Sequence, residues 1–136
     1  MNQSDEYNRR TIEEFRANGG KVEGHTHLLL LTHTGARSGK RRTTPMGYTP
    51  DGDRLIVIAS NFGAPTHPNW YRNLLAHPDV TVEVGTETFA ATGVVIQGQE
   101  RDRLWTKAVE LHPYLVPQQA QTPRQLPVIA LSRRKD

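Results

Sequence analysis

The chain has 136 residues, which is enough for one domain with its own hydrophobic core. It contains no cysteine, so disulfide bonds, thiolate nucleophiles and cysteine-bound metals are excluded, and a cytoplasmic location is predicted. The net charge is +3, and cationic side chains gather at residues 37–42, which favours a local anionic ligand over a nucleic-acid surface.

The first predicted helix covers residues 4–18 and is ended by two glycines. Only three apolar side chains form its stripe, so it buries little surface on folding. We therefore predict a single domain spanning residues 1–136, on which residues 1–24 form a helical arm or lid.

Three strands are predicted next. Residues 27–34 are almost continuously apolar, as expected for a strand buried on both faces. Residues 42–49 and 54–60 flank the turn-forming sequence Pro-Asp-Gly-Asp and are predicted to pair as a hairpin. Pro45 has no N–H to give to a neighbouring strand, so it predicts an edge, a bulge or a ligand beside the backbone.

The rest of the chain brings the prediction to about six strands and three helices. Helical patterns cover residues 68–77 and 99–111, strand patterns cover 80–84, 88–96 and 127–131, and an irregular or short-helical segment fills 112–126. The strands are joined mostly by hairpins, and the helices are inserted late. This order favours an antiparallel barrel or curled sheet, a mainly β fold with helices (α+β), over a doubly wound sheet.

Two loops carry the functional pattern. The glycine-bounded turn GARSGKRR is neither a dinucleotide-binding fingerprint nor a Walker A loop, but it suits a phosphate site with arginine clamps as well as an ordinary cationic hairpin. The second loop, IASNFGAPTHPNW, places small residues at the end of a strand and just before a helix that carries Trp70. Small side chains let a planar ring approach the backbone, so the two loops together predict a large, flat, anionic cofactor.

Other chemistries have little support in the sequence. The six histidines are scattered and no HExxH motif is present, so no metal site is predicted. Ser38 and Ser60 lie outside a GxSxG elbow, and the carboxylates fall at turns or on exposed strand faces.

Four stretches in sequence order resemble one family. The stretches are LLTHTGARSGKRRTTPM, IASNFGAPTHPNWYRNLLAHPDVTVEV, the ERDRLW helix and the closing LPVIAL strand. The family that they resemble is the deazaflavin-dependent nitroreductases, which are split-β-barrel oxidoreductases of actinobacteria that use coenzyme F420. The resemblance implies a split β-barrel of six to seven mostly antiparallel strands, similar to FMN-binding barrels. It places the 8-hydroxy-5-deazaflavin cofactor in a groove on the barrel surface.

The resemblance also implies the residues that bind the cofactor. Arg37, Ser38 and Arg42 would bind the phosphate and glutamyl tail, residues 43–47 and 58–64 would line the ring, and residues 69–73 would close the site. The full set is Ala36, Arg37, Ser38, Arg42, Thr43, Thr44, Pro45, Met46, Gly47, Ile58, Ala59, Ser60, Asn61, Gly63, Ala64, Asn69, Trp70, Tyr71, Arg72 and Asn73.

The implied reaction is hydride transfer from the reduced deazaflavin to an electron-poor acceptor, namely a quinone, an enone or a nitroaromatic. No side chain is predicted as a covalent catalyst. Relatives that reduce bulky nitroimidazoles carry tyrosines after the last helix, where this chain has His112, Leu115 and Gln118, so nitroreduction is not carried over. His112 and Tyr114 are the predicted acceptor contacts.

Two alternatives remain open at this point: an FMN-binding split barrel, and a non-catalytic carrier of the deazaflavin. The predicted partner is a small-molecule hydride acceptor, with no nucleic acid, and the chain is expected to be a monomer or homodimer. No apolar run reaches the length of a membrane span and the N-terminus is not a secretory signal, which leaves peripheral membrane association open.

Overall fold

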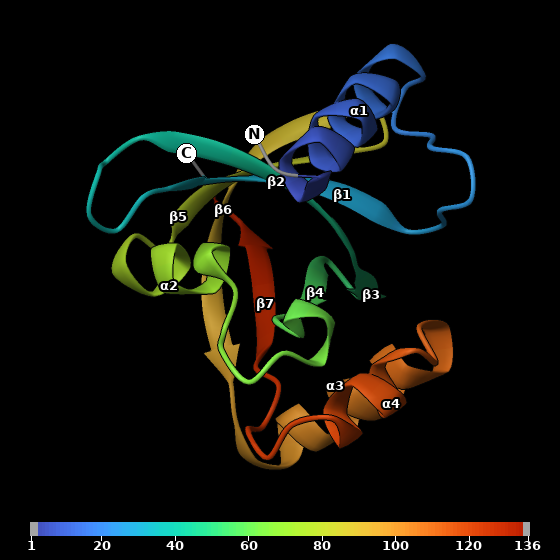
Figure 1. Cartoon of the computed structure of the whole chain (residues 1–136), viewed down its shortest axis with the longest axis vertical. Coiled ribbons are helices and arrows are strands. Elements are labelled where there is room, and N and C mark those ends of the chain that lie inside the picture. The colour runs from blue at the N-terminus through green and yellow to red at the C-terminus, as the bar shows by residue number, and fades with distance from the viewer. Residues whose placement is uncertain (1–2, 135–136) are drawn as a thin grey trace.

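The computed structural model describes residues 3–134; residues 1–2 of the predicted arm and 135–136 of the predicted domain lie outside this range. Within it, seven strands form one antiparallel sheet in the order β2-β1-β5-β6-β7-β4-β3 (Figure 1). The strands are β1 (Leu28–Thr34), β2 (Arg41–Gly47), β3 (Thr49–Asp51), β4 (Arg54–Ile58), β5 (Asp79–Val84), β6 (Glu87–Ile96) and β7 (Val128–Arg133).

The sheet curls into a split barrel. β2 and β3 lie at opposite ends of the strand order, yet Tyr48 alone separates them along the chain. The two edges of the sheet must therefore approach each other at Tyr48. The fold class predicted from the sequence is confirmed, and so is the edge position of Pro45, because β2 ends the strand order.

The predicted hairpin of residues 42–49 with residues 54–60 is wrong in its first half. Arg41–Gly47 pairs with β1, and only Thr49–Asp51 pairs with β4. An alternating strand pattern does not reveal which neighbour each half takes, so the corner at Tyr48 was hidden inside one apparent strand.

The described part of the chain also holds four α-helices and one short 3-10 turn. They are α1 (Gln3–Ala17), η1 (Asn61–Gly63), α2 (Asn69–Ala76), α3 (Gly98–Leu111) and α4 (Leu115–Ala120). The sequence predicted three helices; the fourth, α4, falls in the segment predicted to be irregular or short-helical.

β1 is buried on both faces, as its apolar run predicted. Leu29 and Leu31 belong to the cluster inside the curl, whereas Leu30 packs with Phe15 of α1 on the outside. α1 is also tied to β5, where the Arg16 guanidinium donates to both carboxylate oxygens of Glu83 at 3.0 and 2.8 Å. Burial of Phe15 and this ion pair fix the C-terminal half of the helix against the barrel.

α3 closes the other side. Its Leu104 packs with Ile56 and Val128, on the faces of β4 and β7 that point away from the inner cluster. Asp51 accepts hydrogen bonds from Arg103 and Lys107 of α3 and from Arg54 of β4. These three cations, Arg103 foremost, hold the pKa of the Asp51 carboxyl below its usual range. The network fastens α3 to the β3–β4 hairpin.

Candidate cofactor site

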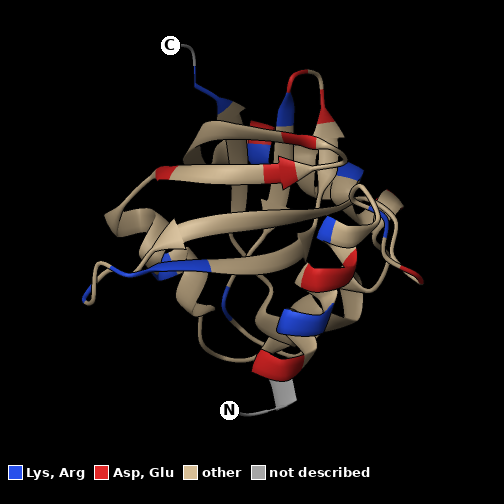
Figure 2. Ribbon diagram, turned by 90° about the horizontal axis from the view of Figure 1, so that it is seen from above, with Lys and Arg blue, Asp and Glu red and all other residues tan. Residues whose placement is uncertain are grey.

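The basic turn (residues 35–40) joins β1 to β2 and carries the cationic run that projects from the body of the protein (Figure 2). The Gly35 N–H donates to the Lys40 carbonyl at 2.8 Å, and the Gly39 N–H donates to the Gly35 carbonyl at 3.0 Å. Ser38 Oγ accepts from the Lys40 N–H at 3.1 Å. The turn is therefore a closed, internally hydrogen-bonded loop that presents Arg37 at its tip.

The two arginines assigned to the anionic tail are exposed, and within residues 3–134 neither forms an ion pair with a carboxylate. On β2, Met46 pairs with Leu29, whose side chain belongs to the cluster inside the curl. Arg42 is four positions from Met46 and pairs with His33, so its side chain lies on the same inward face of β2. Arg41 lies on the opposite face, where its guanidinium donates to Thr81 Oγ1 at 3.0 Å. The side chains of Arg41 and Arg42 therefore lie on opposite faces of β2.

The strand faces also divide the predicted residues 43–46. Thr44 and Met46 share the inward face with Arg42, whereas Thr43 bonds Thr32 through the hydroxyls at 2.8 Å and Pro45 pairs with the outward-facing Leu30. The side chains of Thr43 and Pro45 are therefore not brought together with the other predicted residues.

α2 lies beneath the basic turn and is connected to it by Asn73. Asn73 Oδ1 accepts a hydrogen bond of 2.9 Å from the Ala36 N–H, and its Nδ2 lies 3.0 Å from His33 Nδ1. Burial, together with the charge of Arg42, lowers the pKa of His33 to about 4, so this ring is neutral near pH 7. Asn69 and Arg72 on the same helix are exposed.

The 58–67 loop begins at Ile58, the last residue of β4, and contains η1. Asn61, Phe62 and Gly63 all have positive φ, at 49°, 56° and 78°. A side chain at residue 63 would also come within 2.7 Å of the Gln118 carbonyl oxygen of α4, so glycine is required there on both counts. The small residues of the predicted site shape this loop. Ala59 itself is fully buried.

Arg124 holds this loop in place and was missed by the sequence analysis. Its guanidinium donates to three carbonyl oxygens of the loop, those of Ala59 at 3.2 Å, Ser60 at 2.7 Å and Ala64 at 2.9 Å. Arg124 Nη1 also lies 3.0 Å from His67 Nδ1. The sequence offered no indication of these partners, because Arg124 lies in a proline-rich segment about sixty positions after them.

A third wall is formed where β2 ends. A Cβ placed on Gly47 would lie 3.3 Å from both His112 Cε1 and Tyr114 Oη. His112 is buried and its Nε2 donates to the Tyr48 carbonyl at 2.8 Å, while Tyr114 is half-exposed. Burial raises the pKa of the Tyr114 hydroxyl. The structure therefore brings the two predicted acceptor contacts together beside Gly47.

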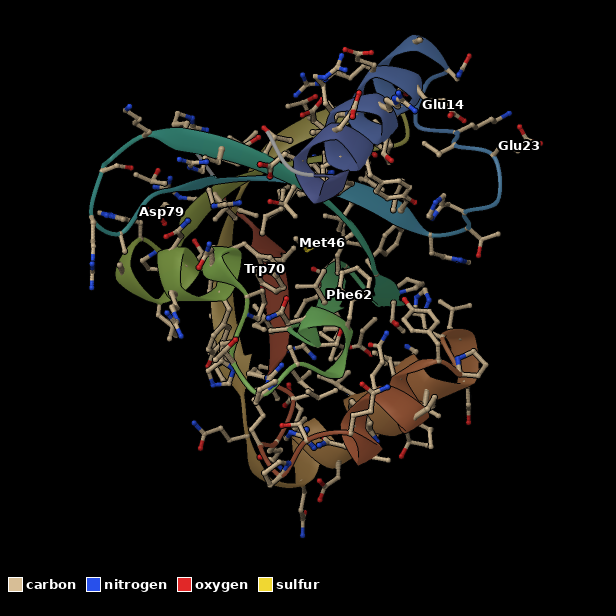
Figure 3. All side chains as sticks on the ribbon, viewed as in Figure 1. Glu14, Glu23, Met46, Phe62, Trp70 and Asp79 are labelled. Atoms are coloured by element: carbon tan, nitrogen blue, oxygen red, sulfur yellow. The ribbon has the colours of Figure 1, made fainter. Side chains whose placement is uncertain are left out.

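The region where β2, α2 and η1 face one another is bounded on three sides by Met46, Trp70 and Phe62 (Figure 3). Trp70 is only 9% exposed and belongs to the inner cluster, with Met46 and Tyr71 packed against that cluster. Phe62, which the sequence analysis did not select, is 83% exposed. The indole of Trp70, which was predicted to contact the cofactor, is therefore part of the hydrophobic core and offers little exposed surface to a ligand.

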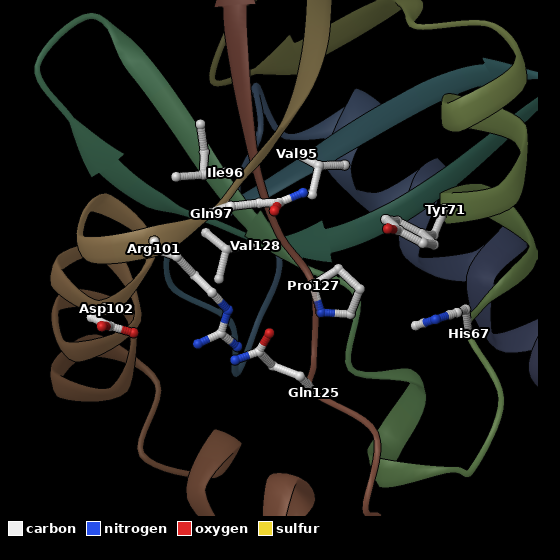
Figure 4. A pocket seen from close by; sticks show the side chains of 11 residues that line it. His67, Tyr71, Val95, Ile96, Gln97, Arg101, Asp102, Gln125, Pro127 and Val128 are labelled. Carbon is white, nitrogen blue, oxygen red and sulfur yellow. The ribbon is translucent and has the colours of Figure 1, made fainter.

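A separate cavity of about 460 Å³ lies between α2 and the start of α3 (Figure 4). Among the predicted site residues, all of which the structure describes, Tyr71 alone lines it. Its other walls include His67, Arg101 and Gln125. Arg101 already donates to the Leu126 carbonyl at 2.7 Å. This cavity is thus distinct from the region where most predicted residues gather.

The residues present suit a deazaflavin with a long anionic tail. The tail would meet Arg37 and Arg42, which form no ion pair with any described carboxylate, and the ring would meet the small residues of the 58–67 loop. Within residues 3–134, no group of three or more His, Asp or Glu side chains is arranged to hold a metal ion. In the same range, no helix has both the length and the apolar character that crossing a membrane requires.

The chain is similar to known proteins over almost its whole length. A sequence model of the F420H(2)-dependent quinone reductase family matches residues 6–133. An F420H(2)-dependent quinone reductase of Mycobacterium tuberculosis is 39% identical over 119 residues, which cover 85% of this chain and 80% of that protein.

Two solved structures agree with this similarity. An F420-H2 dependent reductase has a TM-score of 0.73 and 34% identity, covering 82% of this chain and all of that one. A structure described as a domain-swapped dimer has a TM-score of 0.75 and 32% identity, covering 96% of this chain and all of that one. More distant neighbours, such as a haem storage protein of Vibrio cholerae at 17% identity and a TM-score of 0.56, share the fold.

These similarities confirm the predicted split barrel, the predicted cofactor, coenzyme F420, and the predicted class of enzyme, an F420-dependent oxidoreductase. They do not test the individual site residues, which remain predictions. Because the family model spans nearly all of the sequence, the chain belongs to the F420H(2)-dependent quinone reductase family.

Proposed function

We propose that the protein reduces a quinone with coenzyme F420, binding the cofactor tail at the basic turn and the ring along the 58–67 loop. The observation that carries this assignment is the pair Arg37 and Arg42, which are exposed and have no carboxylate partner within residues 3–134. Arg37 lies on the turn that Asn73 connects to α2, and Arg42 lies just beyond it on β2. Two guanidinium groups of this kind match a phosphate and glutamyl tail.

The reduced cofactor supplies a hydride when it is bound. The protein's own contribution is to bind the tail, hold the ring against the loop fixed by Arg124, and keep the acceptor over it. A quinone that receives a hydride also needs a proton, and the Tyr114 hydroxyl beside Gly47 is the proposed donor from the protein. His112 Nε2 is occupied by the Tyr48 carbonyl, so His112 orients this wall and leaves the proton to Tyr114.

Titration of the purified protein with oxidised coenzyme F420, FMN and FAD, followed by tryptophan fluorescence, tests the cofactor assignment. We expect preference for coenzyme F420; preference for FMN would overturn it. Oxidation of the reduced cofactor by menadione then tests catalysis. Binding without oxidation by menadione, a cyclohexenone or a nitroaromatic would instead make the protein a carrier.

Arginine variants test the tail site. Arg37→Ala and Arg42→Ala are expected to weaken coenzyme F420 about tenfold each, with a loss that shrinks at high salt. Arg41→Ala is the matched control, since it removes the same charge from the same strand but from the opposite face, where Arg41 bonds Thr81. Equal losses in all three variants would show a general charge effect and no specific tail site.

The proposed setting is the cytoplasm, whose reducing conditions are compatible with a chain that has no cysteine. Light scattering distinguishes a monomer from the homodimer that a related domain-swapped structure suggests. Sedimentation with anionic lipid vesicles tests peripheral contact with a membrane, and absence of co-sedimentation would remove that part of the proposal.

A further inference from the structure

We propose that His33 and Asn73 are positioning residues that hold the backbone of the basic turn in its anion-binding conformation. Asn73 would act on the cofactor tail through the turn, and not by touching the ligand. This inference rests on the proposed function, because it concerns the same tail site.

Three consecutive hydrogen bonds connect the two residues to the turn and to β2. The Ala36 N–H lies 2.9 Å from Asn73 Oδ1, Asn73 Nδ2 lies 3.0 Å from His33 Nδ1, and His33 Nε2 lies 2.9 Å from Thr44 Oγ1. Ala36 immediately precedes Arg37, and Thr44 follows Arg42 by two positions. The network therefore holds the chain on both sides of the two arginines.

The direction of each hydrogen bond follows from the first. A backbone N–H only donates, so the oxygen of the Asn73 amide must face Ala36 and its NH₂ group must face His33. His33 Nδ1 must then accept, which leaves the proton on Nε2 to be donated to the Thr44 hydroxyl. Only a neutral imidazole in this single tautomer satisfies the whole network.

Burial makes the network depend on each member. His33 is 3% exposed and Asn73 is 9% exposed, so water cannot replace a lost partner at little cost. Since Asn73 uses its oxygen on Ala36 and an amide hydrogen on His33, its side chain is occupied inside the protein. This occupation is why we assign it a positioning role.

Arg42 strengthens the argument for a neutral His33. The two residues are paired across β1 and β2, and the cationic guanidinium disfavours a second positive charge nearby. A protonated His33 would donate from Nδ1, turn the Asn73 amide over and leave the Ala36 N–H facing an NH₂ group. The same arginine that is proposed to bind the tail therefore also protects the network beneath it.

The decisive experiment compares coenzyme F420 with the deazariboflavin that lacks the phosphate and glutamates. Asn73→Leu and His33→Leu are expected to weaken coenzyme F420 about tenfold, because a displaced turn would cost the tail about one charge-assisted hydrogen bond. They are expected to change the affinity for the tail-less compound less than about twofold. His33→Asn is the conservative control, because its Oδ1 takes the place of Nδ1 as acceptor for Asn73, and should retain most of the affinity.

Equal losses for both compounds would overturn the positioning role, since they would mean ring contact or general disruption. No loss for either compound would overturn it as well. Should the wild-type protein bind no coenzyme F420, the proposed function fails, and amide hydrogen exchange of Ala36 still tests the network. Slow exchange in the wild type that becomes fast in Asn73→Leu supports it, and equal rates contradict it.

Discussion

Arg124 Nη2 donates a hydrogen bond of 2.7 Å to the carbonyl oxygen of Ser60, which lies in the loop predicted to face the cofactor ring. The same guanidinium reaches the carbonyl oxygens of Ala59 and Ala64. Carbonyl oxygens that turn inward to one cation leave the other side of the loop free to face a ligand. The shape of the 58–67 loop is therefore set by a residue from the segment between α4 and β7.

Arg124→Lys tests this control of the loop. An ammonium group cannot span the three carbonyl oxygens that the planar guanidinium reaches, so we expect a loss of about 2 kcal/mol in the free energy of unfolding. Affinity for coenzyme F420 and for the tail-less deazariboflavin should fall together, because the ring site is affected. Arg133→Lys, at an exposed ion pair with Glu87, is the control. Different losses for the two compounds would contradict a role in the ring site.

Gly93→Ala tests the packing of α2 on the sheet. A Cβ on Gly93 would lie 2.6 Å from Leu74 Cδ1, and Leu74 is 1% exposed, so the added methyl has no room. We expect the free energy of unfolding to fall by about 1–3 kcal/mol in urea denaturation. Leu74→Ala alone leaves a cavity, but combined with Gly93→Ala it makes space for the methyl. Additive losses in the double variant would show that the two side chains do not clash.

The sequence predicted the barrel because its information was local. β1 was found from the apolar run that buries Leu29 and Leu30 on opposite faces, and α2 began where Pro68 predicted it. The basic turn and the small residues of the 58–67 loop also stood out as short motifs. Each of these features depends on neighbours a few positions away, which a pattern can record.

What the sequence did not reveal depends on long-range contacts. The corner at Tyr48 follows from the partners of β2 and β3, and the role of Arg124 follows from carbonyl oxygens about sixty positions earlier. Asn73 was predicted as a residue closing the site, but the amide is occupied by His33 and Ala36. No spacing rule joins positions 33, 36 and 73, so this network could not be predicted.

Gly47→Ala tests the acceptor wall. The φ of Gly47 is not positive, so alanine is allowed, but its Cβ would lie 3.3 Å from His112 and Tyr114 and displace them by a few tenths of an ångström. We expect the KM for menadione to rise about threefold to tenfold, since displacement of His112 and Tyr114 weakens acceptor binding. Tyr114→Phe, which removes the proposed proton donor, should instead lower kcat. A changed cofactor affinity with unchanged KM would place Gly47 against the cofactor.

The pH dependence of stability tests the neutral state of His33. In the unfolded chain the pKa of this histidine is about 6.5, and in the folded protein burial and the charge of Arg42 lower it to about 4. Between these values the unfolded state binds more protons, so stability is full above about pH 6.5 and falls as the pH is lowered toward about 4. The His33→Asn variant lacks this titration.

The difference in unfolding free energy between wild type and His33→Asn should therefore be constant above about pH 7 and shrink progressively toward about pH 4.5 in urea denaturation. Parallel curves for the wild type and His33→Asn would instead mean that His33 accepts a proton in the folded protein as readily as in the unfolded chain. The hydrogen bond from Asn73 to Nδ1 would then not hold the ring neutral.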